Sequence, residues 1–283
     1  MAFDFRQRRR AEKALRSALL LPPAVFWSVV FASVAGVRPA RALLMLEEPN
    51  VNTNVNLEAA VGVLAFLGSG FVAVLLALVL AHALATRRYA RARKTAVVGV
   101  ALGALYLVAV LGFSLASGER VLAGGQEKYF CEIDCHLAYS VTGVRRAKTL
   151  GGPGAAATAG GEFYVVTVRT RFDPETISPR RGDSPLTPNP RDASVYDADG
   201  KRYEVSAEGQ RALDAVGGAG RPFSTALRPG ESYETVLVFD LPEGVRDPTL
   251  LVSESDLPTR FIIGHENSPL HKRTRFRLDA SAG

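Results

Sequence analysis

Three long runs without a charged side chain constrain this fold more than any other feature of the sequence. They cover residues 17–37, 59–85 and 95–117. A helix needs about 20 apolar residues to cross the hydrocarbon core of a bilayer, which is roughly 30 Å thick. Buried helices of soluble proteins rarely reach that length without a polar face. The sequence therefore predicts three transmembrane helices, which form a membrane domain over residues 1–117.

The first run also has features of a cleaved signal peptide. Six basic residues precede it, and residues 32–35 read Ala-Ser-Val-Ala, a small-residue pattern that is typical of a cleavage site. The apolar run is longer than the usual signal core of about 7–15 residues. We expect it to be kept as a transmembrane helix, and cleavage stays open as the alternative.

The distribution of Lys and Arg predicts the orientation of the membrane domain. The N-terminal tail carries six, and connector 86–94 carries five, whereas residues 38–58 hold only Arg38 and Arg41 beside three glutamates. Lys and Arg concentrate on the cytoplasmic side of membranes. We therefore expect a multi-pass membrane protein with its N-terminus in the cytoplasm and its C-terminal domain in the periplasm or outside the cell.

The net charge divides at the same place. Residues 1–117 carry +8, and residues 118–283 carry −2. A C-terminal domain without excess positive charge is poorly suited to neutralise phosphates, so nucleic acid is excluded as a partner. The spans contain no Asp, Glu, Lys or Arg, which argues against a transporter or pump, because charges inside the membrane mark ion paths.

The C-terminal half has the period-two pattern of β-strands. After a tether at 118–126, a domain at 127–283 alternates apolar and polar residues over 163–172 and 233–241, and Ile133, Leu137, Tyr139 and Val141 indicate a third strand. Shorter candidates are 193–196, 202–205, 250–253, 260–263 and 274–278. Residues 207–215 are expected to form a short helix, and the Gly/Ala-rich stretch 151–161 a flexible loop.

Turn signals separate these strands. Residues 197–200, Asp-Ala-Asp-Gly, predict a hairpin, and residues 228–231, Arg-Pro-Gly-Glu, predict a turn before the longest strand. Seven or eight short strands with such turns favour a β-sandwich. The predicted fold class is an α + β membrane protein, with three N-terminal transmembrane helices followed by an antiparallel β-sandwich.

A family resemblance is carried by three segments: the strand 164–169, the hairpin 197–203, and the run from 227 to 242. Together they resemble the immunoglobulin-like β-sandwich domains of uncharacterised function on bacterial lipoproteins and membrane anchors, over about residues 126–280. The resemblance implies an immunoglobulin-like fold and an extracytoplasmic location. It implies no functional residues, because fold alone does not give function.

One motif carries chemistry, Cys131-Glu-Ile-Asp-Cys135-His136. Thiolates and imidazole suit copper(I) or zinc. With His271, and with His265 as a weaker candidate, the motif predicts a metal site built from Cys131, Cys135, His136 and His271. The spacing of the cysteines is similar to the copper loop of cytochrome oxidase subunit II and nitrous oxide reductase. It departs from that loop because Tyr139 stands where a histidine is expected and the C-terminal domain has no methionine.

Two other interpretations of the motif stay open. In an oxidising compartment, Cys131 and Cys135 form a disulfide. This requires a turn or helical loop at 131–135, because two strand residues four apart lie about 13 Å from each other and a disulfide needs Cα atoms within about 7 Å. Alternatively, Cys135 continues the apolar face of Ile133 and Leu137 as a buried thiol.

The sequence contains a fold signal and no catalytic signature. We therefore expect a non-enzymatic protein without a cofactor, in which membrane helices hold a sandwich domain that binds another membrane or periplasmic protein. The lipid bilayer is its first expected partner. The alternative function is a copper or zinc binding or thiol-redox module that uses Cys131, Cys135 and His136 near the membrane surface.

Overall fold

The computed structural model describes residues 52–131, 136–177 and 180–279. The chain divides into two compact units, Met1–Pro49 and Asn50–Gly283, and every described residue belongs to the second. The first predicted membrane helix, at 17–37, lies outside the described residues, so it stays a prediction. So do the assignments of residues 38–51.

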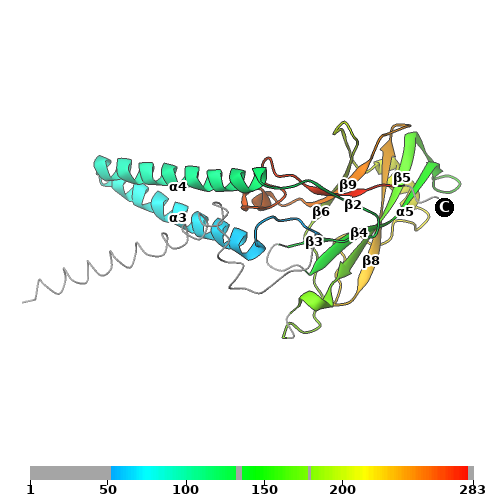
Figure 1. The fold of residues 1–283 in the computed structure, drawn as a ribbon, viewed down its shortest axis with the longest axis horizontal. Coiled ribbons are helices and arrows are strands. Elements are labelled where there is room, and N and C mark those ends of the chain that lie inside the picture. Colours follow the sequence, from blue (N-terminus) through cyan, green and yellow to red (C-terminus); the bar gives the residue numbers. More distant parts are fainter. Residues whose placement is uncertain (1–51, 132–135, 178–179, 280–283) are drawn as a thin grey trace, which may run out of the picture. The chain divides into compact units, whose positions relative to one another are not determined.

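Two long apolar helices open the described part of the chain. They are α3 (Ala59–Ala85) and α4 (Tyr89–Leu115), which lie side by side and antiparallel (Figure 1). Their most apolar windows have mean hydropathies of 2.7 and 2.4, so both are long and apolar enough to cross a membrane. Large side chains such as Phe71 and Val100 are exposed along them. An all-round apolar surface left uncovered is typical of a helix surrounded by lipid.

The predicted span 59–85 coincides with α3, whereas α4 lies closer to the N-terminus than the predicted span 95–117. Helix α4 begins six residues earlier and ends at Leu115, so most of the expected connector 86–94 is helical. The physical reason is local, because Ala, Arg and Lys are all strong helix formers. Only Thr86, Arg87 and Arg88 link the helices, and Arg87 has a φ of 54°.

The remainder of the second unit is built on two five-stranded sheets. The first has the order β1-β3-β4-β5-β8, with bounds Asn52–Thr53, Lys128–Phe130, Leu137–Leu150, Ala157–Phe172 and Ser232–Leu241. The second has the order β2-β10-β9-β6-β7, with bounds Arg120–Leu122, Thr274–Arg277, Thr249–Glu254, Arg191–Tyr196 and Arg202–Tyr203. The fold is therefore a pair of apolar helices and a sheet-rich C-terminal domain.

The period-two pattern places one face of each sheet in a common core. Tyr164, Val166 and Val168 of β5 pack with Leu250 and Val252 of β9, all of them buried. Residues between them on β5 face the other way. Burial of two facing apolar surfaces is the main force that holds the sheets together.

The short helix α5 (Ala207–Asp214) confirms the prediction at 207–215. Ser206 caps it by accepting a hydrogen bond from the Gly209 N–H at 3.2 Å. Its buried Ala212 and Leu213 pack on Phe163 on the outer face of the first sheet. A second, smaller core therefore lies outside the sandwich.

Most predicted strands and the hairpin at 197–200 are confirmed, and three local predictions were wrong. Residues 260–263 form no strand, because Arg260 and Phe261 end a 3₁₀ turn, η3 (Leu257–Phe261), which has Pro258 at its second position. Residues 157–161 extend β5 rather than a loop, because Gly151 has a φ of 95° and turns the β4–β5 hairpin early. The sheets are not purely antiparallel, since β1 pairs with β3 and β2 with β10 in parallel.

Two strands lie outside the predicted limits of the sandwich. Strand β1 precedes α3 in the chain but joins the first sheet beside β3, with Asn52 opposite Lys128. Strand β2 lies within the expected tether 118–126 and joins the second sheet, with Arg120 opposite Thr274. Both ends of the helical pair are therefore held in the sheets.

Candidate functional site

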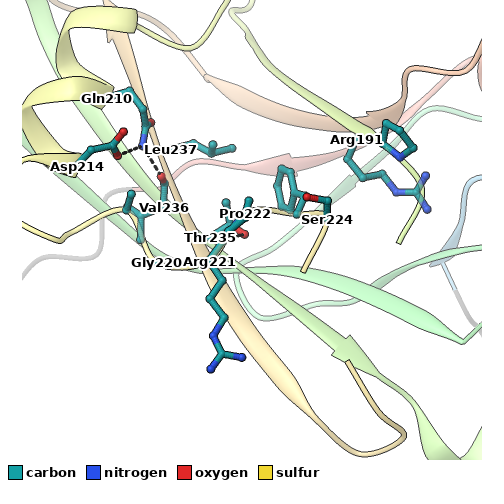
Figure 2. A pocket seen from close by; sticks show the side chains of 13 residues that line it. Arg191, Gln210, Asp214, Gly220, Arg221, Pro222, Ser224, Thr235, Val236 and Leu237 are labelled. Carbon is teal, nitrogen blue, oxygen red and sulfur yellow. Dashed lines mark hydrogen bonds between the residues drawn. The ribbon is translucent and has the colours of Figure 1, made fainter. Parts of the chain in front are cut away.

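An open pocket of about 750 Å³ lies beside α5 and β8 (Figure 2). Its wall is mostly apolar main chain and side chain from segment 219–224 and from β8. Gln210 donates to the Val236 carbonyl oxygen at 3.1 Å and to Asp214 at 3.2 Å, so its amide fixes the wall. Arg221 lies at the exposed rim.

The predicted metal or disulfide motif is only partly described. Cys131 is buried and disulfide-bonded. Cys135, the only other cysteine in the sequence, lies outside the described residues, so the pairing of the two stays a prediction.

The structure places His136 in a contact of its own. Its Nδ1 lies 2.7 Å from the hydroxyl oxygen of Thr176, and its ring stacks on Phe172 with the centroids 5.7 Å apart. Phe172 is the last residue of β5, and Thr176 lies in the 3₁₀ turn just after it. This histidine packs against the sandwich as a core side chain does.

The other two histidines considered as metal ligands, His265 and His271, lie in the loop before β10. His271 Nδ1 is 2.6 Å from its neighbour's carbonyl oxygen, that of Lys272, and burial lowers the pKa of this half-buried ring. His265 is fully buried in a different set of contacts, described below. Over the described ranges, no group of three or more His, Cys, Asp or Glu side chains is placed to hold a metal ion.

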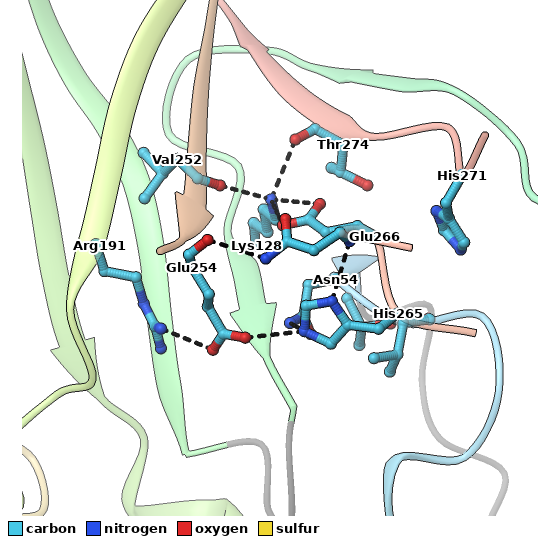
Figure 3. Close-up of polar contacts among 12 residues, drawn as sticks. Asn54, Lys128, Arg191, Val252, Glu254, His265, Glu266, His271 and Thr274 are labelled. Atoms are coloured by element: carbon cyan, nitrogen blue, oxygen red, sulfur yellow. Dashed lines mark hydrogen bonds and ion pairs between the residues drawn. The ribbon is translucent and has the colours of Figure 1, made fainter. Parts of the chain in front are cut away.

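The polar cluster that sequence analysis missed is a buried ion pair. Lys128 of β3 lies 2.8 Å from both carboxylate oxygens of Glu266, and both side chains are almost fully buried (Figure 3). The Lys128 ammonium also donates to the carbonyl oxygens of Val252 at 2.9 Å and Thr274 at 3.2 Å. All three of its protons are thus used.

A second buried acid lies next to this pair. Glu254 of β9 accepts from Arg191 at 2.7 Å and contacts His265 Nε2 at 2.8 Å. The Asn267 N–H donates to His265 Nδ1 at 3.0 Å, which assigns the proton of the ring to Nε2. In this tautomer His265 Nε2 donates to the Glu254 carboxylate.

Asn54 connects this cluster to the segment before α3. Its side-chain oxygen accepts from the Cys131 N–H at 2.8 Å, its main-chain oxygen accepts from the Glu266 N–H at 2.9 Å, and its amide nitrogen lies 3.2 Å from His265 Nε2. We call Asn54, Lys128, Arg191, Glu254, His265 and Glu266 the junction cluster. It joins residues before α3, residues after α4 and three further segments of the sheet domain.

The junction cluster contains two positive and two negative side chains. Burial lowers the pKa of Lys128, and the adjacent Glu266 carboxylate opposes that effect. Buried ion pairs add little net stability, but loss of one partner leaves an uncompensated buried charge. The cluster is therefore suited to fix how these segments meet.

A second ionic cluster lies on the first sheet. Arg171 donates to both Glu127 oxygens at 2.8 and 2.7 Å and to Asp173 at 3.1 Å, while the Tyr129 hydroxyl donates to Asp173 at 2.6 Å. The hydrogen bond from Arg171 lowers the pKa of Glu127. Burial raises the pKa of Tyr129, which stays a proton donor.

No sequence signal predicted the junction cluster. Lys128 stands in a Lys-Tyr-Phe strand where a charged residue is expected to face solvent, and Asn54 lies in a polar stretch between two predicted spans. His265 was considered only as a metal ligand. The only sequence pattern that could have indicated buried polar groups here is the pair His265-Glu266, which stands between apolar residues and a turn.

Comparison with known protein families matches residues 133–259 to DUF4352, a domain of unknown function. The match lies within the sheet-rich domain and begins after both helices. No curated protein matches.

Two solved structures are similar to parts of this chain. A conserved hypothetical protein from Bacillus anthracis has 14% identity and a TM-score of 0.32, and the match covers 41% of this chain and 82% of that one. MPT63, a secreted protein from Mycobacterium tuberculosis, has 13% identity and a TM-score of 0.31, with coverage of 56% and 99%.

Proposed function

We propose that this chain is a membrane-anchored, non-enzymatic binding module, with α3 and α4 in the bilayer and the sheet domain outside the cytoplasm. The observation that supports it most is the way the helical pair ends. Strand β1 precedes α3 in the sequence, strand β3 follows α4, and the two strands pair in one sheet. A hairpin of two apolar helices whose ends return to one folded domain is a suitable anchor.

The charges at the other end of the hairpin support the orientation. Arg87, Arg88, Arg91, Arg93 and Lys94 lie at the turn between the helices and in the first turns of α4. Basic residues next to a span favour the cytoplasmic side. The sheet domain, at the opposite end of both helices, then lies on the outer side.

The binding role is supported by the pocket next to α5. It is concave and largely apolar, and Arg221 and Asp214 provide charge at its edge. Concave, largely apolar surfaces with a few polar groups are where binding sites of folded domains commonly lie. We propose that this one docks a segment of another membrane or extracytoplasmic protein.

Alkaline carbonate extraction tests the anchor. The full chain is expected to stay in the membrane pellet, and a variant with Leu75→Arg and Val100→Arg, both on exposed helix faces, is expected to be retained less well than the unmodified chain. Quantitative release of the unmodified chain would refute the anchor. Extraction of a variant with exposed Val216→Arg in the sheet domain is the matched control and should not change.

Photocrosslinking in intact cells tests the binding site. A photoreactive phenylalanine analogue at Arg221, on the pocket rim, should form a discrete crosslinked product. The same analogue at Asp199, in the hairpin between β6 and β7, should not. Equal products from both positions, or none from Arg221, would contradict docking at the pocket.

A further inference from the structure

We infer that the surface formed by Leu257, Arg260, Phe261, Leu270 and Lys272 contacts the outer leaflet of the lipid bilayer. We call these five residues the interfacial surface. The inference rests on the proposed function, because it requires α3 and α4 to span the membrane. It adds that the sheet domain lies on the lipid and does not stand clear of it.

Contacts with both helices fix where this surface lies. The Tyr106 hydroxyl in α4 donates to the Phe261 carbonyl oxygen at 2.7 Å. The Lys272 N–H donates to the hydroxyl of Ser117, just after α4, at 2.8 Å. In α3, a Cβ on Gly62 would lie only 2.8 Å from the Ile263 carbonyl oxygen. The segment that carries the surface therefore packs directly against the helical pair.

The position of Tyr106 along α4 sets the depth of this contact. Tyr106 lies about 18 Å beyond Lys94 along the helix axis at 1.5 Å per residue, whereas Leu115 lies about 32 Å beyond it. A hydrocarbon core of about 30 Å that starts near Lys94 therefore extends past Tyr106. Basic side chains that reach back toward water shift this boundary by only about one helical turn. Phe261, whose carbonyl oxygen accepts the hydrogen bond from Tyr106, is consequently at the level of the outer leaflet.

The side chains of the surface suit that level. Leu257, Phe261 and Leu270 are 62%, 54% and 69% exposed, which is unusual for three large apolar residues in one short segment. Leu270 also has a φ of 64°, a conformation that costs a leucine energy. In water the apolar surface of these three side chains stays exposed, whereas contact with lipid chains removes it from water.

The charges of the segment are complementary to anionic headgroups. Between residues 257 and 273, the side chains of Arg260, Lys272 and Arg273 are exposed or half-buried and positive, and the acid Glu266 is buried against Lys128. Exposed Asp256 and Glu58 flank the segment. Basic side chains next to apolar ones are the composition of surfaces that lie in the membrane interface.

Lipid explains this surface better than a protein partner because the surface continues the exposed apolar faces of the helices. Leu107 and Val108, the two residues that follow Tyr106 in α4, are 54% and 63% exposed. A lipid layer that covers these two residues reaches Phe261 as well. Two main-chain oxygens of η3 are paired, since that of Thr259 accepts from the Ile262 N–H and that of Phe261 accepts from Tyr106, and this pairing suits the interface.

Depth-dependent fluorescence quenching tests the inference on the full chain. Single Phe261→Cys, Leu270→Cys, Leu107→Cys and Val216→Cys variants are labelled with an environment-sensitive fluorophore and reconstituted in vesicles of phosphatidylcholine and phosphatidylglycerol. Nitroxide lipids quench from a position near the headgroup or near the chain end. Leu107 reports the anchor, and Val216, 56% exposed in the sheet domain, is the matched control. The unsubstituted protein should take up no label.

We expect labels at positions 261 and 270 to be quenched by the nitroxide lipids several-fold more than at 216. Omitting phosphatidylglycerol should weaken this quenching. If 261 and 270 match 216 while 107 is quenched, the anchor stands and the interfacial surface is refuted, which leaves a protein partner as its occupant. If 107 is not quenched, the anchor itself fails and this inference fails with it.

Discussion

The Cys131 N–H donates a hydrogen bond of 2.8 Å to the side-chain oxygen of Asn54, although two long helices separate these residues in the sequence. Asn54 precedes α3, and Cys131 follows α4. The bond therefore joins, within the sheet domain, the segment that precedes the helical pair to the segment that follows it. The rest of the junction cluster surrounds this bond, so the way the helical pair joins the sheet domain depends on a few buried polar groups.

Loss of one partner of the buried ion pair should be costly. Lys128→Met leaves the Glu266 carboxylate buried and unpaired, and we expect a loss of about 3–5 kcal/mol in unfolding free energy. The double variant with Glu266→Leu removes both charges and should be less destabilised than Lys128→Met alone. Chemical denaturation of the full chain in detergent measures both.

The exposed pair Arg246 and Asp199 provides the control for this experiment. Arg246→Met should change the unfolding free energy by less than about 1 kcal/mol. Additive losses from Lys128→Met and Glu266→Leu would contradict a coupled buried pair.

Two glycines of α3 should differ in tolerance to alanine. A Cβ at Gly62 would lie 2.8 Å from the Ile263 carbonyl oxygen, whereas a Cβ at Gly68 has nothing within 4 Å. We expect Gly62→Ala to destabilise the junction of helix and sheet by about 1–3 kcal/mol through overpacking. Gly68→Ala should be neutral or stabilising, because Ala is the better helix former. Equal midpoints of thermal unfolding for the two variants would mean that α3 does not pack on Ile263.

Acid should destabilise the sheet domain through the Arg171 cluster. Arg171 lowers the pKa of Glu127 below its ordinary value near 4.5. Burial opposes ionisation of Asp173, but hydrogen bonds from Tyr129, the Glu175 N–H and Arg171 outweigh it and lower its pKa below 3.8. A carboxyl whose pKa is lowered on folding stabilises the fold above its ordinary pKa, and this contribution is lost as the pH falls through the folded value.

Unfolding temperatures measured between neutral pH and acid should therefore drop below about pH 4.5. The drop should be smaller in Arg171→Met, which is already less stable at neutral pH. Arg246→Met should keep the full dependence. If Arg171→Met and the unmodified chain show the same dependence on pH, the cluster does not control acid stability.

We predict that Cys131 pairs with Cys135. Alkylation of the denatured chain without reductant should then add no label, and reduction should expose two thiols. The copper and zinc contents of the purified chain should be far below one ion per chain, because a disulfide sulfur is not a thiolate ligand. Two alkylated cysteines before reduction, or one metal ion per chain that is lost in His136→Ala, would favour the metal hypothesis.

Sequence patterning predicted the elements whose burial is regular. Span 59–85 coincides with α3, and the alternation at 163–172 and 233–241 appears in β5 and β8. In these segments the apolar residues follow the helical or strand period without interruption. The start of α4 was missed because the same basic residues that indicate the cytoplasmic side are also good helix formers.

The junction cluster was not predictable for a different reason. Asn54, Lys128 and Glu266 are far apart in the sequence, and each is a residue type that is usually exposed. Their burial results from the pairing of β1 with β3, a parallel contact between a two-residue strand and its neighbour. Local patterns carry no information on such a contact. The 3₁₀ turn at 257–261 was similarly hidden, since its apolar residues face outward.

Thiol accessibility in intact cells is the most direct test of the proposed membrane-spanning helices and of the side on which the sheet domain lies. Single cysteines at Val216, in the sheet domain, and at Thr86, between α3 and α4, are treated with a membrane-impermeant maleimide before and after permeabilisation. We predict labelling at 216 in intact cells and at 86 only after permeabilisation. Labelling at 86 and protection at 216 in intact cells would place the sheet domain in the cytoplasm, and equal labelling of both without permeabilisation would contradict a membrane-spanning pair of helices.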